Sequence, residues 1–243
     1  MTSDKELIAL QFPFFDDKYE DNLQKLIAYI KKAPKGSVVL APELCLTNFS
    51  FSKMQESARF GESALPRLLK LCDDKTIAFT MTEKVNGNFY NCAKIIHNGA
   101  VVHTQPKVNL FKFGDEDKYF KEGKTENIKI VEIDGLKYAI LICFEIRFIE
   151  FWEKIKGADI ILVPALWGKL RKEQFEAITK SLAIINQAFV IASGSSNENM
   201  ASSSGIITPF GEEFRDDKSE FIAKVVYLKE IKKMRRYMDV GIL

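Results

Sequence analysis

Short apolar runs alternate with helical patterns along most of the chain. Mainly apolar runs, typical of buried strands, cover residues 7–12, 37–41, 138–142, 160–163 and 189–193, and the run 138–142 has no polar break. Apolar residues at helical spacing follow several of these runs, at 22–30, 65–72, 144–156 and 175–185. The alternation predicts an α/β fold in which most buried strands lead into a helix.

Two stretches differ because their strands succeed one another directly. Strands are predicted at 76–82, 89–97 and 101–104, joined at Asn86-Gly87 and Asn98-Gly99, and at 128–133 and 136–142, joined at Asp134-Gly135. Residues 205–208 and 221–228 predict two more strands, and a basic tail follows at 229–236. We therefore expect two β-sheets packed face to face with helices outside. The polar and aromatic segment 109–123 has no clear period and is expected to be a functional loop.

Length and charge limit the classes of protein that fit. The chain has 243 residues, enough for one domain spanning 1–243. Its net charge of +2 gives no basic field for nucleic acid, and no apolar run approaches the roughly 18 residues of a membrane span. We expect a cytoplasmic protein with a small-molecule partner and neither a nucleic-acid nor a membrane partner.

Cysteine usage points away from structural crosslinks. The four cysteines, Cys45, Cys72, Cys92 and Cys143, lie far apart without CxxC pairs in a chain too large to need disulfides. Free thiols are therefore expected. The chain also lacks HExxH and other metal-ligand clusters, so neither a metal nor another cofactor is expected.

Three reactive side chains follow predicted strands. Glu43 comes just after the strand at 37–41, Lys107 after Pro106 ends the β-run, and Cys143 where the apolar run 138–142 stops. Taken singly, a cysteine here is more often core filling, and a charged residue more often solvated. Sites collect at the carboxyl ends of strands in α/β sheets, so the three can converge. The position of Cys143 at the start of a predicted helix favours a thiolate.

Together these three groups are sufficient for nucleophilic acyl chemistry. Glu43 takes the thiol proton, Cys143 attacks a carbonyl carbon, and Lys107 stabilises the developing oxyanion. The backbone N–H of Phe144 is a candidate second oxyanion donor. A papain-like thiol hydrolase would need a histidine base, but His97 and His103 lie in the β-run away from strand ends.

The chain resembles the nitrilase superfamily of carbon-nitrogen hydrolases, in its amidase-like branch, over nearly its whole length. The resemblance is carried by Ala41-Pro42-Glu43-Leu44, by Pro106-Lys107-Val108-Asn109-Leu110-Phe111 and by Leu141-Ile142-Cys143-Phe144-Glu145-Ile146-Arg147-Phe148. It implies a four-layer α-β-β-α sandwich, a homodimer, and a second glutamate in the loop after the lysine. Glu116 matches that glutamate best, with Asp115 and Asp117 as the alternatives.

Some positions depart from the family pattern. Glu145 stands where the family commonly has aspartate, which keeps the charge and lengthens the arm. Leu182 and Ile185 replace a usual arginine and glutamate, and Ile149 replaces a proline. None of these positions belongs to the expected catalytic set of Glu43, Lys107, Cys143 and Glu116.

The resemblance implies a cysteine-dependent amidase that releases ammonia or an amine from a small carboxamide through a thioester. Nitrile hydrolysis, N-carbamoyl hydrolysis and a catalytically silent binding module are the alternatives. Candidate substrate-binding residues are Phe144, Tyr119, Trp167 and Phe49 on the expected strand-end loops.

Overall fold

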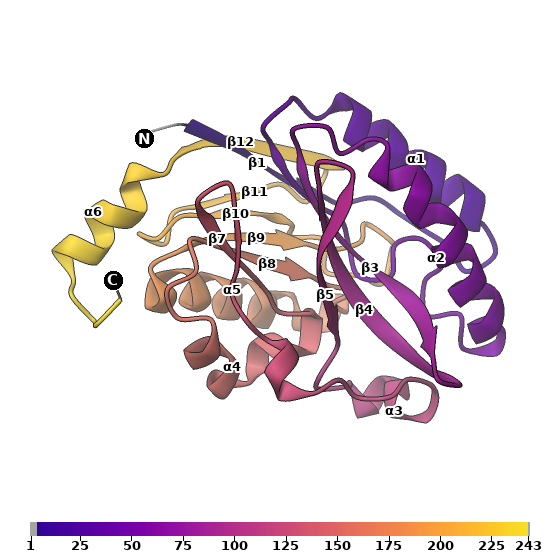
Figure 1. Ribbon diagram of the computed structural model, residues 1–243. Coiled ribbons are helices and arrows are strands. Elements are labelled where there is room, and N and C mark those ends of the chain that lie inside the picture. The colour runs from indigo at the N-terminus through magenta and orange to yellow at the C-terminus, as the bar shows by residue number, and fades with distance from the viewer. Residues whose placement is uncertain (1–3, 243) are drawn as a thin grey trace.

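The computed structural model describes residues 4–242, which form two six-stranded sheets (Figure 1). The first sheet has the order β12 (Phe221–Tyr227), β1 (Asp4–Leu10), β2 (Val38–Leu40), β3 (Thr76–Val85), β4 (Asn88–His97), β5 (Ala100–Pro106). The second has the order β11 (Glu213–Arg215), β10 (Gly205–Ile207), β9 (Phe189–Ser193), β8 (Ile160–Pro164), β7 (Leu136–Ile140), β6 (Val131–Ile133). The centre of each sheet is parallel, β1-β2-β3 in one and β7-β8-β9 in the other, with antiparallel strands on both sides.

Helices cover the outer faces of the two sheets. The helices α1 (Tyr19–Lys32) and α2 (Met54–Leu69) lie on the first sheet, while α4 (Ile149–Lys154) and α5 (Lys172–Asn186) lie on the far side of the second (Figure 1). The short α3 (Glu116–Tyr119) lies near the ends of β4 and β5, and α6 (Lys229–Tyr237) extends from the side where both termini lie. The expected α/β four-layer α-β-β-α sandwich is therefore confirmed.

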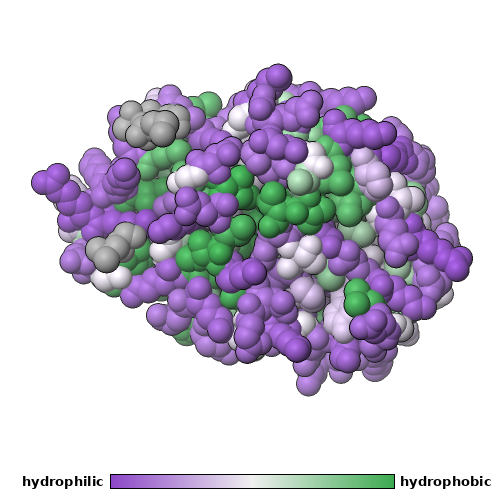
Figure 2. All heavy atoms as spheres, viewed as in Figure 1, coloured by the Kyte–Doolittle hydropathy of each residue, from purple (hydrophilic) through white to green (hydrophobic). Residues whose placement is uncertain are grey.

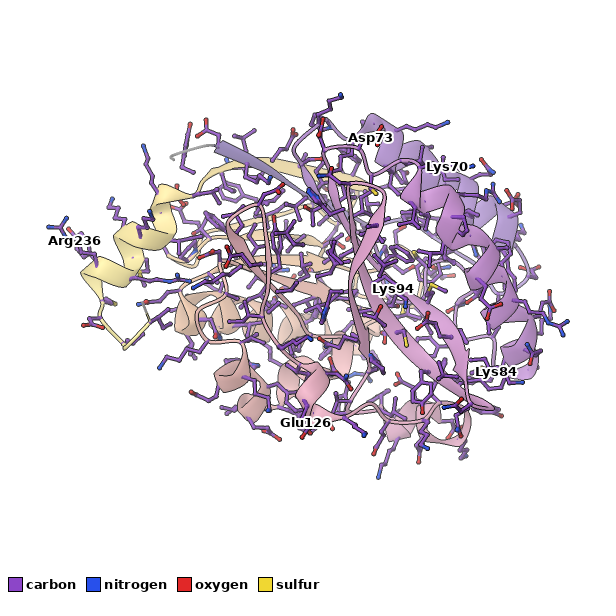
Figure 3. The ribbon with its side chains drawn as sticks, viewed as in Figure 1. Lys70, Asp73, Lys84, Lys94, Glu126 and Arg236 are labelled. Atoms are coloured by element: carbon purple, nitrogen blue, oxygen red, sulfur yellow. The ribbon has the colours of Figure 1, made fainter. Side chains whose placement is uncertain are left out.

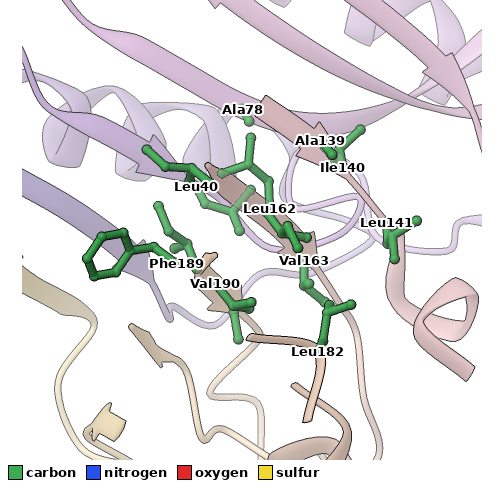
Figure 4. Close-up of a cluster of buried hydrophobic side chains, with 14 of the residues drawn as sticks. Leu40, Ala78, Ala139, Ile140, Leu141, Leu162, Val163, Leu182, Phe189 and Val190 are labelled. Carbon is green, nitrogen blue, oxygen red and sulfur yellow. The ribbon is translucent and has the colours of Figure 1, made fainter. Parts of the chain in front are cut away.

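Alternation along the strands divides the core into layers. Val38 and Leu40 of β2 face the second sheet, whereas Val39 and Ala41 face the helices α1 and α2. This follows from the two-residue period of a strand, which sends successive side chains to opposite faces. Figure 4 shows Leu40 beside Leu162 of β8 in the layer between the sheets. A strand buried on both faces must be apolar throughout, which is the pattern of the sequence.

The tight turns of the sheets agree with the sequence signals. Asn86-Gly87, Asn98-Gly99 and Asp134-Gly135 each have positive φ at both residues. Two consecutive left-handed residues are the requirement of the two-residue hairpin turn that suits the twist of a sheet. These turns set the pairing of β3 with β4, β4 with β5, and β6 with β7.

The sequence pattern missed or misplaced several elements. The helix predicted at 65–72 is the end of α2, which begins at Met54. The first turns were missed because they bury small residues such as Ser57 and Gly61, which give no apolar period. A Cβ on Gly61 would lie 2.7 Å from Cε of Met81, so the absence of a side chain allows α2 to approach β3 closely. The helix predicted at 144–156 is a 3₁₀ turn, Cys143–Arg147, followed by the short α4.

The surface is mainly polar. Figure 2 shows a largely hydrophilic surface with one central band of hydrophobic residues in this view. Charged side chains such as Lys70, Lys84 and Arg236 lie at the periphery, with Arg236 on α6 (Figure 3). The basic tail at 229–236, which gave no helical prediction, forms α6, and β11 was also missed. Across residues 4–242, no helix has both the length and the apolar character needed to cross a membrane.

Candidate active site

The structure brings the four expected catalytic side chains together. Glu43 follows β2, Lys107 follows β5 directly, and Cys143 begins the 3₁₀ turn after β7. Glu116 is the first residue of α3, in the loop segment 109–123. All four are buried, with Glu43 and Lys107 fully so. Residues far apart in the chain meet because the carboxyl ends of strands from both sheets lie at the same place.

A lysine lies between two carboxylates. The Nζ of Lys107 is 2.7 Å from Oε1 of Glu43 and 2.8 Å from Oε1 of Glu116. Burial lowers the pKa of Lys107, but the two carboxylates outweigh it and hold the pKa above its ordinary value. Burial, together with the neighbouring Glu43, raises the pKa of Glu116 even though Lys107 opposes that shift. Lys107 is therefore a fixed ammonium, held in place by two acceptors.

Two further contacts fix the carboxylate of Glu43. The Nδ2 of Asn91 on β4 donates to Oε1 at 2.8 Å, and the backbone N–H of Leu166 donates to Oε2 at 3.1 Å. The backbone N–H of Leu44, whose φ is +48°, donates to Oγ1 of Thr80 at 2.6 Å. Asn91 was not predicted from the sequence, because a single asparagine inside a strand gives no signal of its contact with a distant glutamate.

Cys143 is a buried thiol on a strained backbone. Its φ is +49°, a left-handed value that is uncommon for residues other than glycine and that often marks functional positions. Burial, with Glu43 adding to it, raises the pKa of Cys143 well above its ordinary value, although Lys107 acts in the opposite direction. The expectation that its position favours a thiolate is wrong, because burial and two carboxylates outweigh the turn that follows. A base is needed to remove the proton as the sulfur attacks.

A pocket of about 460 Å³ opens onto Cys143 and Glu116. Its other lining residues are Phe49, Phe51, Phe111, Gly114, Phe144, Arg147, Leu166, Trp167, Gly168, Arg171 and Met200. Three of the four expected substrate-binding residues, Phe49, Phe144 and Trp167, lie on this wall. Tyr119 is not among the lining residues, but it stacks at 4.3 Å between ring centres on Phe51, which is. That Tyr119 binds substrate stays a prediction.

Two arginines lie on the otherwise apolar wall. The guanidinium of Arg147 lies over the Trp167 ring at 4.9 Å, and that of Arg171 lies 5.5 Å from the Phe111 ring. Arg147 also donates to Oε1 of Gln174 at 2.5 Å. Within residues 4–242, neither arginine forms an ion pair with an acidic side chain. The pocket therefore offers two cationic groups to an anionic ligand. Arg171 was not predicted as a site residue, because no motif in the sequence includes it.

Within residues 4–242, the remaining thiols and acids do not form a metal site. Cys45, Cys72 and Cys92 are buried and free, as Cys143 is, so the expected free thiols are confirmed. Burial raises the pKa of Cys45 and of Cys92. In the part of the chain that the structure describes, no three His, Cys, Asp or Glu side chains are arranged to hold a metal ion.

Comparison with known proteins relates the chain to carbon-nitrogen hydrolases and to two amidases. A family model described as carbon-nitrogen hydrolase matches residues 9–222. The chain is 31% identical over 215 residues to the 2-oxoglutaramate amidase of Bacillus subtilis (strain 168), covering 84% of this chain and 82% of that protein. It is 28% identical over 198 residues to the omega-amidase YafV of Escherichia coli (strain K12), covering 79% and 76%.

The fold has close counterparts among solved structures. Nit3 of Saccharomyces cerevisiae, a member of branch 10 of the nitrilase superfamily, superposes with a TM-score of 0.84 at 19% identity, covering 98% of this chain and 95% of that chain. This likeness concerns the fold. With the family match, it confirms the resemblance that the three sequence motifs indicated.

Proposed function

The chain belongs to the carbon-nitrogen hydrolase family, and from that premise we propose that it is a cysteine-dependent amidase for a small carboxamide whose far end carries a carboxylate. The observation that carries the proposal is the pocket itself, in which Cys143 lies beside a carboxylate-lysine-carboxylate array and two unpaired guanidiniums line the wall. The first group of residues performs amide hydrolysis, and the second selects the substrate.

In the first half-reaction the amide is converted into a thioester. Glu43 takes the proton of the Cys143 thiol as the sulfur attacks the amide carbon, and a C–S bond forms. The oxyanion that develops is stabilised by Nζ of Lys107, which Glu43 and Glu116 hold in place, and by the backbone N–H of Phe144. Glu43 then gives its proton to the nitrogen, the C–N bond breaks, and ammonia leaves.

In the second half-reaction water regenerates the thiol. Glu43 takes a proton from water as the water oxygen attacks the thioester carbon. The same oxyanion donors stabilise the new tetrahedral intermediate. Its collapse breaks the C–S bond, the sulfur is reprotonated, and the carboxylic acid leaves. The sum is one amide and one water converted into one acid and one ammonia, without a redox step.

The two arginines support a substrate with an anionic end. A guanidinium matches a carboxylate in planar, bidentate geometry, and such charge-assisted hydrogen bonds are strong. The relatives named as 2-oxoglutaramate amidase and omega-amidase are consistent with a substrate of this kind. The aromatic wall formed by Phe49, Phe111 and Trp167 suits a short aliphatic spacer between the two ends.

The proposal is tested by ammonia release from glutaramate, the monoamide of glutaric acid, with neutral butyramide as the matched substrate. We expect hydrolysis of glutaramate, no turnover by Cys143→Ser, and iodoacetamide modification of Cys143 in preference to Cys45, Cys72 and Cys92. Replacing Arg147 and Arg171 by glutamine should lower kcat/KM for glutaramate roughly tenfold or more, while that for butyramide changes little. Equal kcat/KM for the two amides, or turnover only of a nitrile or an N-carbamoyl compound, would overturn this assignment.

Assembly and location are part of the same proposal. Exposed Ile149, Leu170 and Ile185, all on elements outside the second sheet, support a homodimer, which the family resemblance implies. Light scattering during size-exclusion chromatography measures this directly, and a monomer at all concentrations would contradict it. The four free thiols support a reducing compartment such as the cytoplasm.

A further inference from the structure

A third buried acid, Glu145, lies between the segments that carry Lys107 and Cys143 and does not line the pocket. It belongs to the 3₁₀ turn that begins at Cys143, is fully buried, and does not line the pocket wall. Its two oxygens accept from two different segments. Oε2 accepts the backbone N–H of Ile142 at 2.6 Å, and Oε1 accepts the backbone N–H of Val108 at 2.6 Å. One carboxylate therefore binds the peptide groups next to the nucleophile and next to the catalytic lysine.

The contact with Ile142 closes a tight turn around the nucleophile. The backbone N–H of Glu145 donates to the carbonyl of Ile142 at 3.0 Å, while the side chain of Glu145 accepts the N–H of the same residue. This reciprocal pair encloses Cys143 and Phe144. The left-handed φ of Cys143 costs conformational energy and persists only where surrounding contacts impose it. The two hydrogen bonds between Ile142 and Glu145 are such contacts.

The contact with Val108 links the two sheets at the site. Val108 follows Lys107, which continues from β5 of the first sheet, whereas Ile142 continues from β7 of the second. The side chain of Glu145 therefore ties the segment that carries the ammonium to the segment that carries the thiol, although the two share no strand pairing. A buried carboxylate is the only type of side chain that can accept two N–H groups at once on separate oxygens without presenting a donor of its own.

We propose that Glu145 is a positioning residue for the reaction, which holds the Cys143 turn and the Lys107 segment in register through the N–H groups of Ile142 and Val108. The inference rests on the proposed function only for its turnover assay. Because a misplacement of about 1 Å can cost roughly 100-fold in rate, such a bridge affects catalysis without touching the substrate.

Burial makes this carboxylate responsive to pH. It raises the pKa of Glu145 to about 7, against the two backbone N–H groups and Lys107, which lower it, while Glu43 adds to the rise. Lys107 and Glu43 are the charged side chains that act on it most. Protonation of Glu145 would place an O–H donor on one of its oxygens, facing a peptide N–H that is itself a donor and cannot accept it. The bridge is therefore expected to weaken below neutral pH.

The test compares Glu145→Gln and Glu145→Asp with a matched acid-to-amide control. The control is Asp159→Asn, because Asp159 accepts the N–H of Lys137 at 3.0 Å at the opposite end of β7. Three properties are measured for each variant: kcat and KM on glutaramate, the rate of Cys143 alkylation by iodoacetamide against pH, and hydrogen exchange of the Val108 and Ile142 amides. Thermal unfolding is followed in parallel.

For Glu145→Gln we expect kcat to fall roughly 10- to 100-fold with a much smaller change in KM, slower alkylation, and faster exchange at Val108 and Ile142. The wild-type dependence of the alkylation rate on an ionisation near neutral pH should disappear. Glu145→Asp should retain one of the two contacts and an intermediate kcat. Asp159→Asn should change only thermal stability.

The proposal is overturned if Glu145→Gln behaves like Asp159→Asn, losing thermal stability while kcat, alkylation and the two amides are unchanged. If Glu145→Gln does not fold, Glu145→Asp decides: wild-type kcat with faster exchange at either amide contradicts a positioning role. If wild-type protein does not hydrolyse glutaramate, the proposed substrate is wrong. The alkylation and exchange measurements then still support or refute the role of Glu145, since neither needs turnover.

Discussion

At the scale of single residues, the site is an arrangement of charges around a neutral thiol. Two carboxylates share one ammonium, and this holds Lys107 charged while burial keeps the proton on Cys143. A free thiolate would add a third negative charge to a buried cluster with one cation, which is electrostatically costly. The thiol proton of Cys143 is therefore expected to leave only as the sulfur attacks the substrate. Glu43 and Glu116, which both contact Lys107, are expected to have different roles in that step.

Glu116 should position Lys107 and leave proton transfer to Glu43. Glu116→Gln removes one of the two charged acceptors of Lys107, so we expect kcat on glutaramate to fall roughly 10- to 100-fold through misplacement of the ammonium. Cys143 should still react with iodoacetamide. Glu43→Gln should abolish both half-reactions. Kinetics of ammonia release and alkylation rates measure these effects.

Asp115→Asn is the matched control for Glu116→Gln. Asp115 is adjacent in sequence but exposed, and it pairs with Lys118 at 2.9 Å. We expect wild-type kcat/KM for this variant. Normal turnover by Glu116→Gln together with loss in Asp115→Asn or Asp117→Asn would show that the fourth catalytic residue has been misassigned.

A site residue could be predicted from the sequence where its neighbours form a recognisable strand. Glu43, Lys107 and Cys143 each follow such a strand, and because sites collect at the carboxyl ends of strands, the three were expected to lie together. Asn91 and Arg171 act through contacts with residues far away in the chain, and nothing in their neighbourhood signals those contacts. Tyr119 lies one ring away from the pocket lining, against Phe51, because the sequence does not indicate which way a loop aromatic faces.

At the scale of elements, the segment 109–123 positions both Glu116 and Lys107. It leaves β5, turns through Lys112–Gly114 and α3, and returns to β5 at Gly123. The N–H of Gly123 donates to the carbonyl of Lys107 at 2.8 Å. A Cβ at Gly123 would lie 2.5 Å from the carbonyl oxygen of Pro106, which is backbone and cannot move aside cheaply. The return of the loop therefore depends on the absence of a side chain.

Gly123→Ala should displace the loop from the Lys107 segment. We expect a loss of about 1–3 kcal/mol in the free energy of unfolding from the steric overlap, together with a fall in kcat because Lys107 and Glu116 move apart. Denaturant unfolding and glutaramate kinetics measure the two effects. Glu122→Ala, at an exposed neighbour, is the control and should change neither.

An unchanged kcat in Gly123→Ala would mean that the loop does not fix the lysine. The sequence predicted that 109–123 is a functional loop, but it gave no internal structure for it. Its short helices have too few residues to show a helical period. Gly123 is needed because it approaches Pro106 closely, a contact that only the folded chain makes. The first turns of α2 were missed for a similar reason, since their small buried residues are needed where the helix packs against β3.

At the scale of the whole molecule, the two sheets share one core. Leu7, Ala9, Val38 and Leu40 of the first sheet belong to the same buried cluster as the strands of the second. The proposed catalytic groups are divided between the sheets in the same way, with Glu43 and Lys107 on one side and Cys143 on the other. The proposed mechanism therefore requires the packing of the two sheets. That residues 1–243 form one domain stays a prediction, and it can be tested by cooperativity.

A cavity in the layer between the sheets should destabilise both halves equally. Leu162 of β8 is fully buried beside Leu40, and Leu162→Ala should cost about 2–5 kcal/mol in the free energy of unfolding. If the chain is one domain, calorimetry should give a single transition at a lower temperature. Hydrogen exchange should rise together in β3 and β4 of the first sheet and in β8 and β9 of the second. As a control, Val85→Ala, at the exposed end of β3, should shift neither measurement appreciably. Two separate transitions, with only the second sheet affected by Leu162→Ala, would show that the halves fold independently and that the site is assembled at an interface between two units.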